Sequence, residues 1–299
     1  MGRVTEDEYD RLSSAGYVRA DVIGRTGLEK SYEARLRGTM GLRQIEVDVR
    51  GTAQRVVAQV EPQDGEHMRL ALDLEAQKKL EESLRRGLRS ASRKRGAAVV
   101  MDPRDGSIIA LVSLPGFDPN PFVSGIDQKT YAELTGNKDR PLFPRAVSGE
   151  YPSGSIIKPI FAAVGLEIGT ITPKTTVHSV GGIKVADSFF PDWKPGGHGT
   201  VDVVSAIANS VNTFFYYLGG GYGDFVGMGP DKLAEGGARF GLGAETGIDL
   251  PHEGSGLLPT PEWKQRVKSE EWYIGDTYHF AIGQGDVLTT PMQLAIMVM

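Results

Sequence analysis

The sequence predicts an α+β fold, in which helices pack against a mostly antiparallel sheet. Two apolar runs, residues 97–101 and 107–113, flank a turn at 102–106 where proline and glycine suit a tight reversal, so a β-hairpin is expected. A one-faced helix precedes this hairpin, because leucines recur at helical spacing behind the N-cap residue Asp73. These leucines are Leu74, Leu80, Leu84 and Leu88. Further helical segments follow the hairpin, and this order is typical of an α+β domain.

The first 66 residues are polar and mixed, and they predict a small pedestal segment before a larger domain at 67–299. We expect helices at 6–14 and 27–37, and the alternation at 44–50 predicts a strand. A segment of this size buries little apolar surface, so it should depend on packing against a larger domain. A further strand is expected at 68–72.

Composition excludes several classes of protein. With 299 residues, 40% hydrophobic and 24% charged, the chain is an ordinary globular protein, and its net charge of −5 argues against a nucleic-acid partner. The absence of cysteine excludes disulfides and thiolate metal sites. One basic cluster is interpreted as a solvated helix end, where cations complement the helix dipole. Its members are Arg85, Arg86, Arg89, Arg93, Lys94 and Arg95.

The two ends of the sequence carry no membrane signal. Its first 20 residues are polar and charged, and no apolar run reaches the ~18–20 residues that a spanning helix needs, so this chain is expected to be soluble. The apolar stretch 294–299 stops in the middle of a predicted helix. We therefore expect that the C-terminal end is cut.

Ser155 and Lys158 form the first candidate site. They lie three residues apart at the start of a helix predicted over 155–168, so their side chains share one face. A serine hydroxyl becomes nucleophilic when a neighbouring base takes its proton, and a buried lysine with a lowered pKa can be that base. The helix N-terminus and the Ser155 amide would stabilise negative charge on the reacting oxygen.

A structural interpretation of this pair stays open. Ser-x-x-Lys arises by chance in many chains, and it also describes a helix start with an exposed lysine. Pro159 favours the functional interpretation, because a proline inside a helix costs about 3 kcal/mol and such violations tend to mark functional sites.

Ser210 and Asn212 form a second candidate group between helices expected at 201–209 and 213–218. If the link between these helices is extended, residues two apart face the same way. Ser210 would then supply a proton relay, and the Asn212 amide would hold a substrate amide. The alternative is a helix N-cap, which both residue types favour.

Together, Ser155-x-x-Lys158 and Ser210-x-Asn212 resemble the first two active-site motifs of penicillin-binding proteins and serine β-lactamases. The flanking segments resemble more specifically the class B, elongation-type group called penicillin-binding protein 2, in order along nearly the whole chain. These segments are residues 149–159, 212–216, 246–250, 260–264, 281–285 and 290–293, with 21–30 in the pedestal.

The resemblance implies a penicillin-binding transpeptidase domain, which has the serine β-lactamase-like fold, and a peptidoglycan D,D-transpeptidase activity. Ser155 would be the nucleophile, Lys158 and Ser210 would relay protons, and Asn212 would bind substrate. Stem peptides and β-lactam antibiotics would bind the site, and a membrane glycan polymerase would be the partner. No cofactor is implied. The full-length protein would be anchored in the inner membrane with its catalytic domain outside the cytoplasm.

The sequence departs from the family pattern in two respects, because both the third active-site motif and the membrane anchor expected before the pedestal are absent, so we expect that both ends are trimmed. The third motif, Lys-Thr/Ser-Gly, is absent, so we expect the 299-residue chain to be acylated at least roughly a hundredfold more slowly than an extended one. Asp192 and His198 match a stretch that binds zinc in some elongation-type relatives. Because Val211 stands where those relatives have cysteine, we expect no metal.

Two other functions remain as alternatives. A serine β-lactamase or β-lactam sensor shares the motifs, although such a protein is compact around them and does not require a pedestal. A non-catalytic cell-wall binding module would present the pedestal to its partners without using Ser155.

Overall fold

The computed structural model describes residues 2–299 and contains both helices and strands, as the α+β prediction requires. The chain divides into two compact units. The first unit contains the residues up to Leu72 together with segments 115–142 and 248–252, and the second contains 73–114, 143–247 and 253–299. The sequence assigned these two inserted segments to the larger domain, and a boundary at 66/67 stays a prediction.

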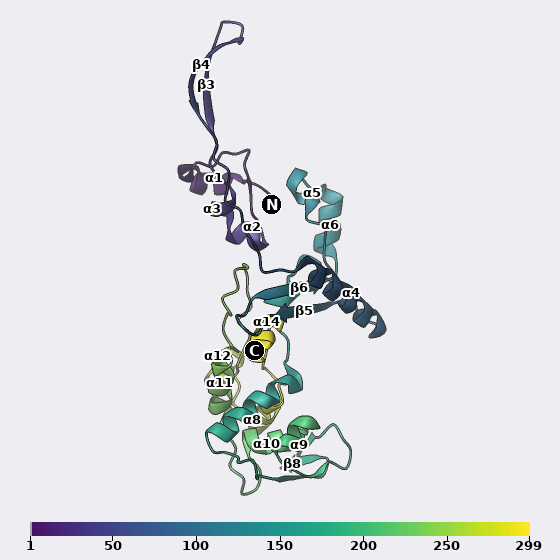
Figure 1. The fold of residues 1–299 in the computed structure, drawn as a ribbon. Coiled ribbons are helices and arrows are strands. Elements are labelled where there is room, and N and C mark those ends of the chain that lie inside the picture. Colours follow the sequence, from purple (N-terminus) through teal and green to yellow (C-terminus); the bar gives the residue numbers. More distant parts are fainter. Residues whose placement is uncertain (1) are drawn as a thin grey trace. The chain divides into compact units, whose positions relative to one another are not determined.

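Short elements make up the first unit (Figure 1). A two-stranded antiparallel hairpin of β3 and β4 is its longest feature, and both strands are exposed along their whole length. The elements are β1 (Gly2–Arg3), α1 (Glu6–Leu12), a 3-10 turn (Ser13–Ala15), β2 (Val22–Ile23), α2 (Gly27–Ser31), α3 (Glu33–Leu36), β3 (Leu42–Val47), β4 (Ala53–Val60), α5 (Asn120–Ser124) and α6 (Gln128–Gly136).

Several expectations for this unit need correction. The helix expected at 27–37 is broken at Tyr32, whose φ of −115° and ψ of 18° lie outside the helical region. β4 was not predicted, because its sequence, Ala-Gln-Arg-Val-Val-Ala-Gln-Val, does not alternate regularly between apolar and polar residues. The strand expected at 68–72 is wrong. No strand within residues 2–299 pairs with it, and the apolar Leu70 and Leu72 are exposed.

The predicted hairpin is confirmed in the second unit. β5 (Gly96–Met101) and β6 (Ile108–Leu114) pair antiparallel, and α4 (Leu74–Ser90) packs on them, mainly on β6. Asp73 caps α4, since its carboxylate accepts the backbone N–H of Ala76 at 2.9 Å. α7 (Arg145–Ser148) and α14 (Pro291–Met297) also pack against β5. Within residues 2–299 every sheet is a two-stranded antiparallel pair.

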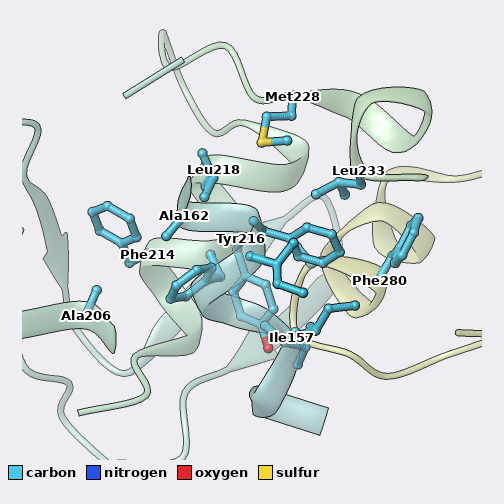
Figure 2. Packing of buried hydrophobic residues seen from close by; sticks show 14 of the residues in the cluster. Ile157, Ala162, Ala206, Phe214, Tyr216, Leu218, Met228, Leu233 and Phe280 are labelled. Carbon is cyan, nitrogen blue, oxygen red and sulfur yellow. The ribbon is translucent and has the colours of Figure 1, made fainter. Parts of the chain in front are cut away.

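The main core of the second unit lies among four helices: α8 (Lys158–Glu167), α10 (Asn212–Gly220), α11 (Gly229–Arg239) and α13 (Ile274–Ala281). Figure 2 shows their buried side chains converging, with Phe214 and Tyr216 from α10, Leu233 from α11 and Phe280 from α13. Each such side chain contributes roughly 1.5–3 kcal/mol when it is fully buried. The core therefore fixes α8 and α10, which carry the candidate site, relative to each other.

The remaining elements of this unit surround that core. They are the 3-10 turn η2 (Gly154–Ile157), β7 (Val177–Ser179), β8 (Gly182–Val185), β9 (Ser188–Pro191), β10 (Gly199–Val201), α9 (Val203–Ala208) and α12 (Pro261–Lys268). α9 starts later than the helix expected at 201–209. Val201 belongs to β10, and Asp202 caps the helix by accepting the N–H of Ser205.

Candidate functional site

Ser155 lies in the 3-10 turn η2, which continues directly into α8. The backbone N–H of Lys158 donates to the carbonyl of Ser155, so the two residues span one tight turn. In a 3-10 turn the side chains at i and i+3 lie above one another, so this backbone geometry agrees with the expectation that both share one face. Ser155 is exposed and Lys158 is buried, with 1% of its surface exposed.

Pro159 is not a helix violation, and the interpretation based on it needs correction. Because η2 precedes α8, Pro159 stands in the first turn of the α-helix, where its missing N–H has no intrahelical partner to lose. The proline therefore favours the start of α8 at this point and carries no information about function.

Two backbone connections hold the chain that leads into Ser155. Tyr151 and Thr289 exchange N–H···O bonds of 2.9 and 2.8 Å, and the N–H of Gly154 donates to the carbonyl of Gly283 at 2.8 Å. Gly283 has a φ of +71°, and a Cβ there would lie 2.1 Å from the carbonyl oxygen of Gly154. Glycine is therefore required at 283 for this close approach.

Lys158 is the centre of the site. Its Nζ donates to the Ser210 carbonyl at 2.9 Å, to Ser210 Oγ at 3.2 Å and to Asn212 Oδ1 at 2.6 Å, and it lies 5.3 Å from the ring centre of Phe215. The structure thus brings three of the four predicted residues into direct contact. Three acceptors match the three protons of an ammonium group. Ser155 Oγ is not hydrogen-bonded to Nζ within the described part of the chain.

Burial lowers the pKa of Lys158 from its usual 10.5 to about 8, while the negative charge of Asp192 acts in the opposite direction. A lysine with this pKa is partly neutral near physiological pH. It can therefore accept a proton from a hydroxyl that approaches it, as a general base must.

Ser210 terminates α9 in an unusual way. The N–H of Ser210 donates to the Ile207 carbonyl at 3.1 Å and the N–H of Val211 to the Ala206 carbonyl at 2.9 Å, which together form a Schellman motif. Ser210 occupies its left-handed position, with a φ of +51°, where glycine is the usual residue. The expected extended link is therefore wrong at Ser210, although its carbonyl and hydroxyl both face Lys158.

The two weak metal candidates lie side by side. His198 Nε2 is 3.8 Å from Asp192 Oδ1, and both side chains are buried. The Asp192 carboxylate already accepts hydrogen bonds from the N–H groups of Trp193, Asn212 and Thr213 and from hydroxyls. No cluster of three or more potential ligands is found in the part of the chain that the structure describes. Two side chains do not make up a zinc site, which takes three or four protein ligands.

Sequence reasoning missed two contributors to this site. Gly283 supports the turn that carries Ser155, and Thr213 binds Asp192 from the first turn of α10. The signal for Gly283 was a glycine-rich segment, Gly283-Gln-Gly285, that sequence analysis used only for its resemblance.

No helix within residues 2–299 combines the length and apolar character that crossing a bilayer requires.

Comparison with known families places this site in context. A model of the penicillin binding protein transpeptidase domain matches residues 96–299, and one of the penicillin-binding protein dimerisation domain matches residues 1–70. The first match alone covers more than half of the chain. This chain belongs to the penicillin-binding proteins.

Curated relatives within the penicillin-binding proteins cover nearly all of the chain. Peptidoglycan D,D-transpeptidase MrdA of Acinetobacter baumannii is 40% identical over 99% of this chain and 42% of its own length. The protein of the same name from Escherichia coli is 38% identical over 99% of this chain and 46% of its own length. The chain therefore spans less than half of these two relatives.

Solved structures of penicillin-binding proteins share the fold. Pseudomonas aeruginosa PBP2 in complex with WCK 5153 has a TM-score of 0.82 and 36% identity, and the match covers 99% of this chain and 59% of that one. The complex between PBP2 and MreC from Helicobacter pylori has a TM-score of 0.84 and 32% identity, with 98% and 52% covered. The expected penicillin-binding transpeptidase fold and the resemblance to penicillin-binding protein 2 are confirmed.

Proposed function

We propose that the protein containing this chain is a peptidoglycan D,D-transpeptidase that acts through an acyl-enzyme on Ser155. One observation carries the proposal. A buried lysine, whose pKa burial lowers to about 8, lies one turn after an exposed serine and beside Ser210 and Asn212. This arrangement supplies a nucleophile, a base and a group that can bind a substrate amide. The names of the relatives supply the substrate class.

The proposed reaction consists of two acyl transfers, first to Ser155 and then to an amine. In the first, Lys158 Nζ takes the hydroxyl proton while Ser155 Oγ bonds to the penultimate D-Ala carbonyl carbon of a stem peptide. The bond to the terminal D-Ala nitrogen breaks, and that nitrogen receives the proton through Lys158 and Ser210. In the second, an amine of another stem peptide attacks the ester carbon and gives up a proton, which returns to Ser155 Oγ as the ester breaks.

Penicillins provide the experimental test, since they acylate such a serine and leave a stable ester. A fluorescent penicillin should label the protein, and mass spectrometry should place the adduct on Ser155. Labelling should be lost in Ser155→Ala and in Lys158→Ala. Ser153→Ala is the matched control, because the buried Ser153 hydroxyl has no hydrogen-bond partner among residues 2–299 and should not be needed. Labelling that survives both active-site variants would overturn the proposal, and rapid release of the label would favour a β-lactamase.

We also propose that the full-length protein works at the outer face of the cytoplasmic membrane with a glycan polymerase as its partner. Support comes from a solved structure titled as a peptidoglycan synthase complex that coordinates polymerization and crosslinking, which matches with a TM-score of 0.85 and 34% identity. Cell fractionation and crosslinking of the full-length protein test this. Recovery in the cytosolic fraction, without a crosslinked membrane partner, would contradict it.

A further inference from the structure

Asp192 lies immediately after β9 and is tied to the start of α10. Its carboxylate accepts the N–H of Asn212 at 3.1 Å, the N–H of Thr213 at 3.0 Å and the hydroxyl of Thr213 at 2.8 Å. The first N–H groups of a helix have no partner within that helix, and Val211 at the N-cap supplies no side-chain acceptor. Asp192 therefore caps α10 from a different segment of the chain.

The capped turn is the one that binds Lys158. Asn212 is the first residue of α10, and its Oδ1 accepts from Lys158 Nζ at 2.6 Å while its backbone N–H is held by Asp192. Asn212 also donates from Nδ2 to the Pro191 carbonyl at 3.4 Å, directly before Asp192. The segment 191–192 thus fixes both the backbone and the side chain of Asn212.

The charge of Asp192 is fixed by the same contacts. Burial raises the pKa of Asp192, but the bonds from Thr213, Asn212 and Trp193 outweigh it, so the pKa lies below its usual range and the group stays ionised. Ser179 from β7 adds a further hydroxyl donor at 3.3 Å. A carboxylate with no exposed side-chain surface therefore persists beside the lysine site.

Resting on the function proposed above, we propose that Asp192 is a positioning residue for the acylation of Ser155. It holds the first turn of α10, and with it Asn212, against Lys158, and its buried carboxylate is linked to that lysine through Asn212. This role needs only residues of this chain, and it explains why the donors to Asp192 come from α10, β7 and its own loop.

Among the groups around Lys158 within residues 2–299, only Asp192 contributes a charge that acts on its pKa. Ser210 and Asn212 present neutral acceptors, Phe215 presents a ring, and the charge that acts on the lysine comes from Asp192. His198 lies next to Asp192, with its Nε2 3.8 Å from Asp192 Oδ1. From α10, the hydroxyl of Tyr216 donates to the Pro191 carbonyl, and burial raises the pKa of Tyr216 to about 12, so it stays neutral.

The test is the pH profile of Ser155 acylation by a fluorescent penicillin in Asp192→Asn. The neutral lysine is the base, so in the native protein the rate should rise as pH passes through about 8. Without the carboxylate charge the lysine loses its proton more easily. The rise should therefore shift to lower pH, while the plateau rate falls because the cap is weaker. Asp187→Asn is the matched control, since it removes the same charge from the exposed β8–β9 turn. It should change neither the pH at which the rate rises nor the plateau rate.

Each outcome decides the inference. A profile of Asp192→Asn that does not move, or moves to higher pH, overturns the charge effect. Thr213→Val deletes the 2.8 Å bond and keeps the charge, so its plateau should fall without a shift, and an unchanged plateau overturns the positioning effect. Should Asp192→Asn fail to fold, Thr213→Val still decides whether Asp192 positions α10. Failure of the native protein to be labelled at Ser155 would instead count against the proposed function.

Discussion

Lys158 and Ser210 are joined through two different atoms of the serine, because Nζ donates to its carbonyl oxygen at 2.9 Å and to its hydroxyl at 3.2 Å. The carbonyl contact depends on the backbone and survives any substitution that keeps the left-handed conformation of residue 210. The hydroxyl contact depends on serine. The contact that holds the lysine and the proton relay proposed for the hydroxyl can therefore be separated by mutation.

Ser210→Gly and Ser210→Ala should differ in stability although both lose the hydroxyl. Glycine tolerates a φ of +51°, whereas alanine keeps the strain of a Cβ in the left-handed region. The glycine variant should therefore have the larger free energy of unfolding, by about 1 kcal/mol in urea denaturation. Both variants should acylate slowly if the hydroxyl relays the proton. Equal stability of the two would show that residue 210 carries no such strain.

Lys158→Met should change how stability depends on pH. The pKa of Lys158 is about 8 in the folded protein and close to 10.5 when unfolded, so between these values the unfolded state binds more protons. Stability from this group therefore rises with pH across that window, by about 3 kcal/mol in total. Methionine does not titrate, so the Lys158→Met protein should lack this rise in the free energy of unfolding. Urea titrations of both proteins at several pH values measure that free energy. Curves of unfolding free energy against pH that run parallel for the two proteins would contradict a lowered pKa.

Gly283→Ala should cost both stability and acylation. The new Cβ would collide with the Gly154 carbonyl and the Ser153 hydroxyl, in addition to the strain of a positive φ. Gly169→Ala is the matched control, because Gly169 has a φ of +75° and open space where the Cβ would stand. The control should lose about 1 kcal/mol from backbone strain alone. A melting temperature and labelling rate for Gly283→Ala equal to those of the control would rule out the close approach to Gly154.

Chelation of divalent metal should leave the melting temperature unchanged. The Asp192 oxygens are engaged by protein donors, and His198 is the one further candidate ligand that the resemblance indicates. A structural zinc ion contributes folding free energy directly, so its removal would be conspicuous. A drop of several degrees that zinc restores, and that His198→Ala abolishes, would refute the expectation.

Local patterns predicted much of this structure because local interactions determine it. The turn at 102–106 fixed the hairpin, Asp73 identified the start of α4, and the spacing of Ser155 and Lys158 described one helical turn. The grouping of Ser210 and Asn212 with Lys158 was expected from family resemblance, and the contacts agree with it.

Interactions between distant segments explain the errors. A strand was expected at 68–72, yet a strand also needs a pairing partner, and the sequence of the segment does not show whether one is available. The cap that Asp192 provides for α10 joins residues 20 and 21 positions apart, which no local pattern reveals. Pro159 was misinterpreted because the α-helix was expected to start at Ser155, whereas Ser155 lies in a 3-10 turn and the α-helix starts at Lys158.

The bridge between Tyr151 and Thr289 has a consequence for how the protein is made. The two residues lie 138 positions apart, so the turn that carries Ser155 lacks this partner until Thr289 has been synthesised. At a typical rate of synthesis that delay is on the order of ten seconds. Contacts of such long sequence separation also form late in folding, because their loop-closure entropy must be overcome first. Ser155, the proposed nucleophile, should therefore be one of the last groups to reach its final geometry, and a newly made chain should not be acylated by penicillin until then.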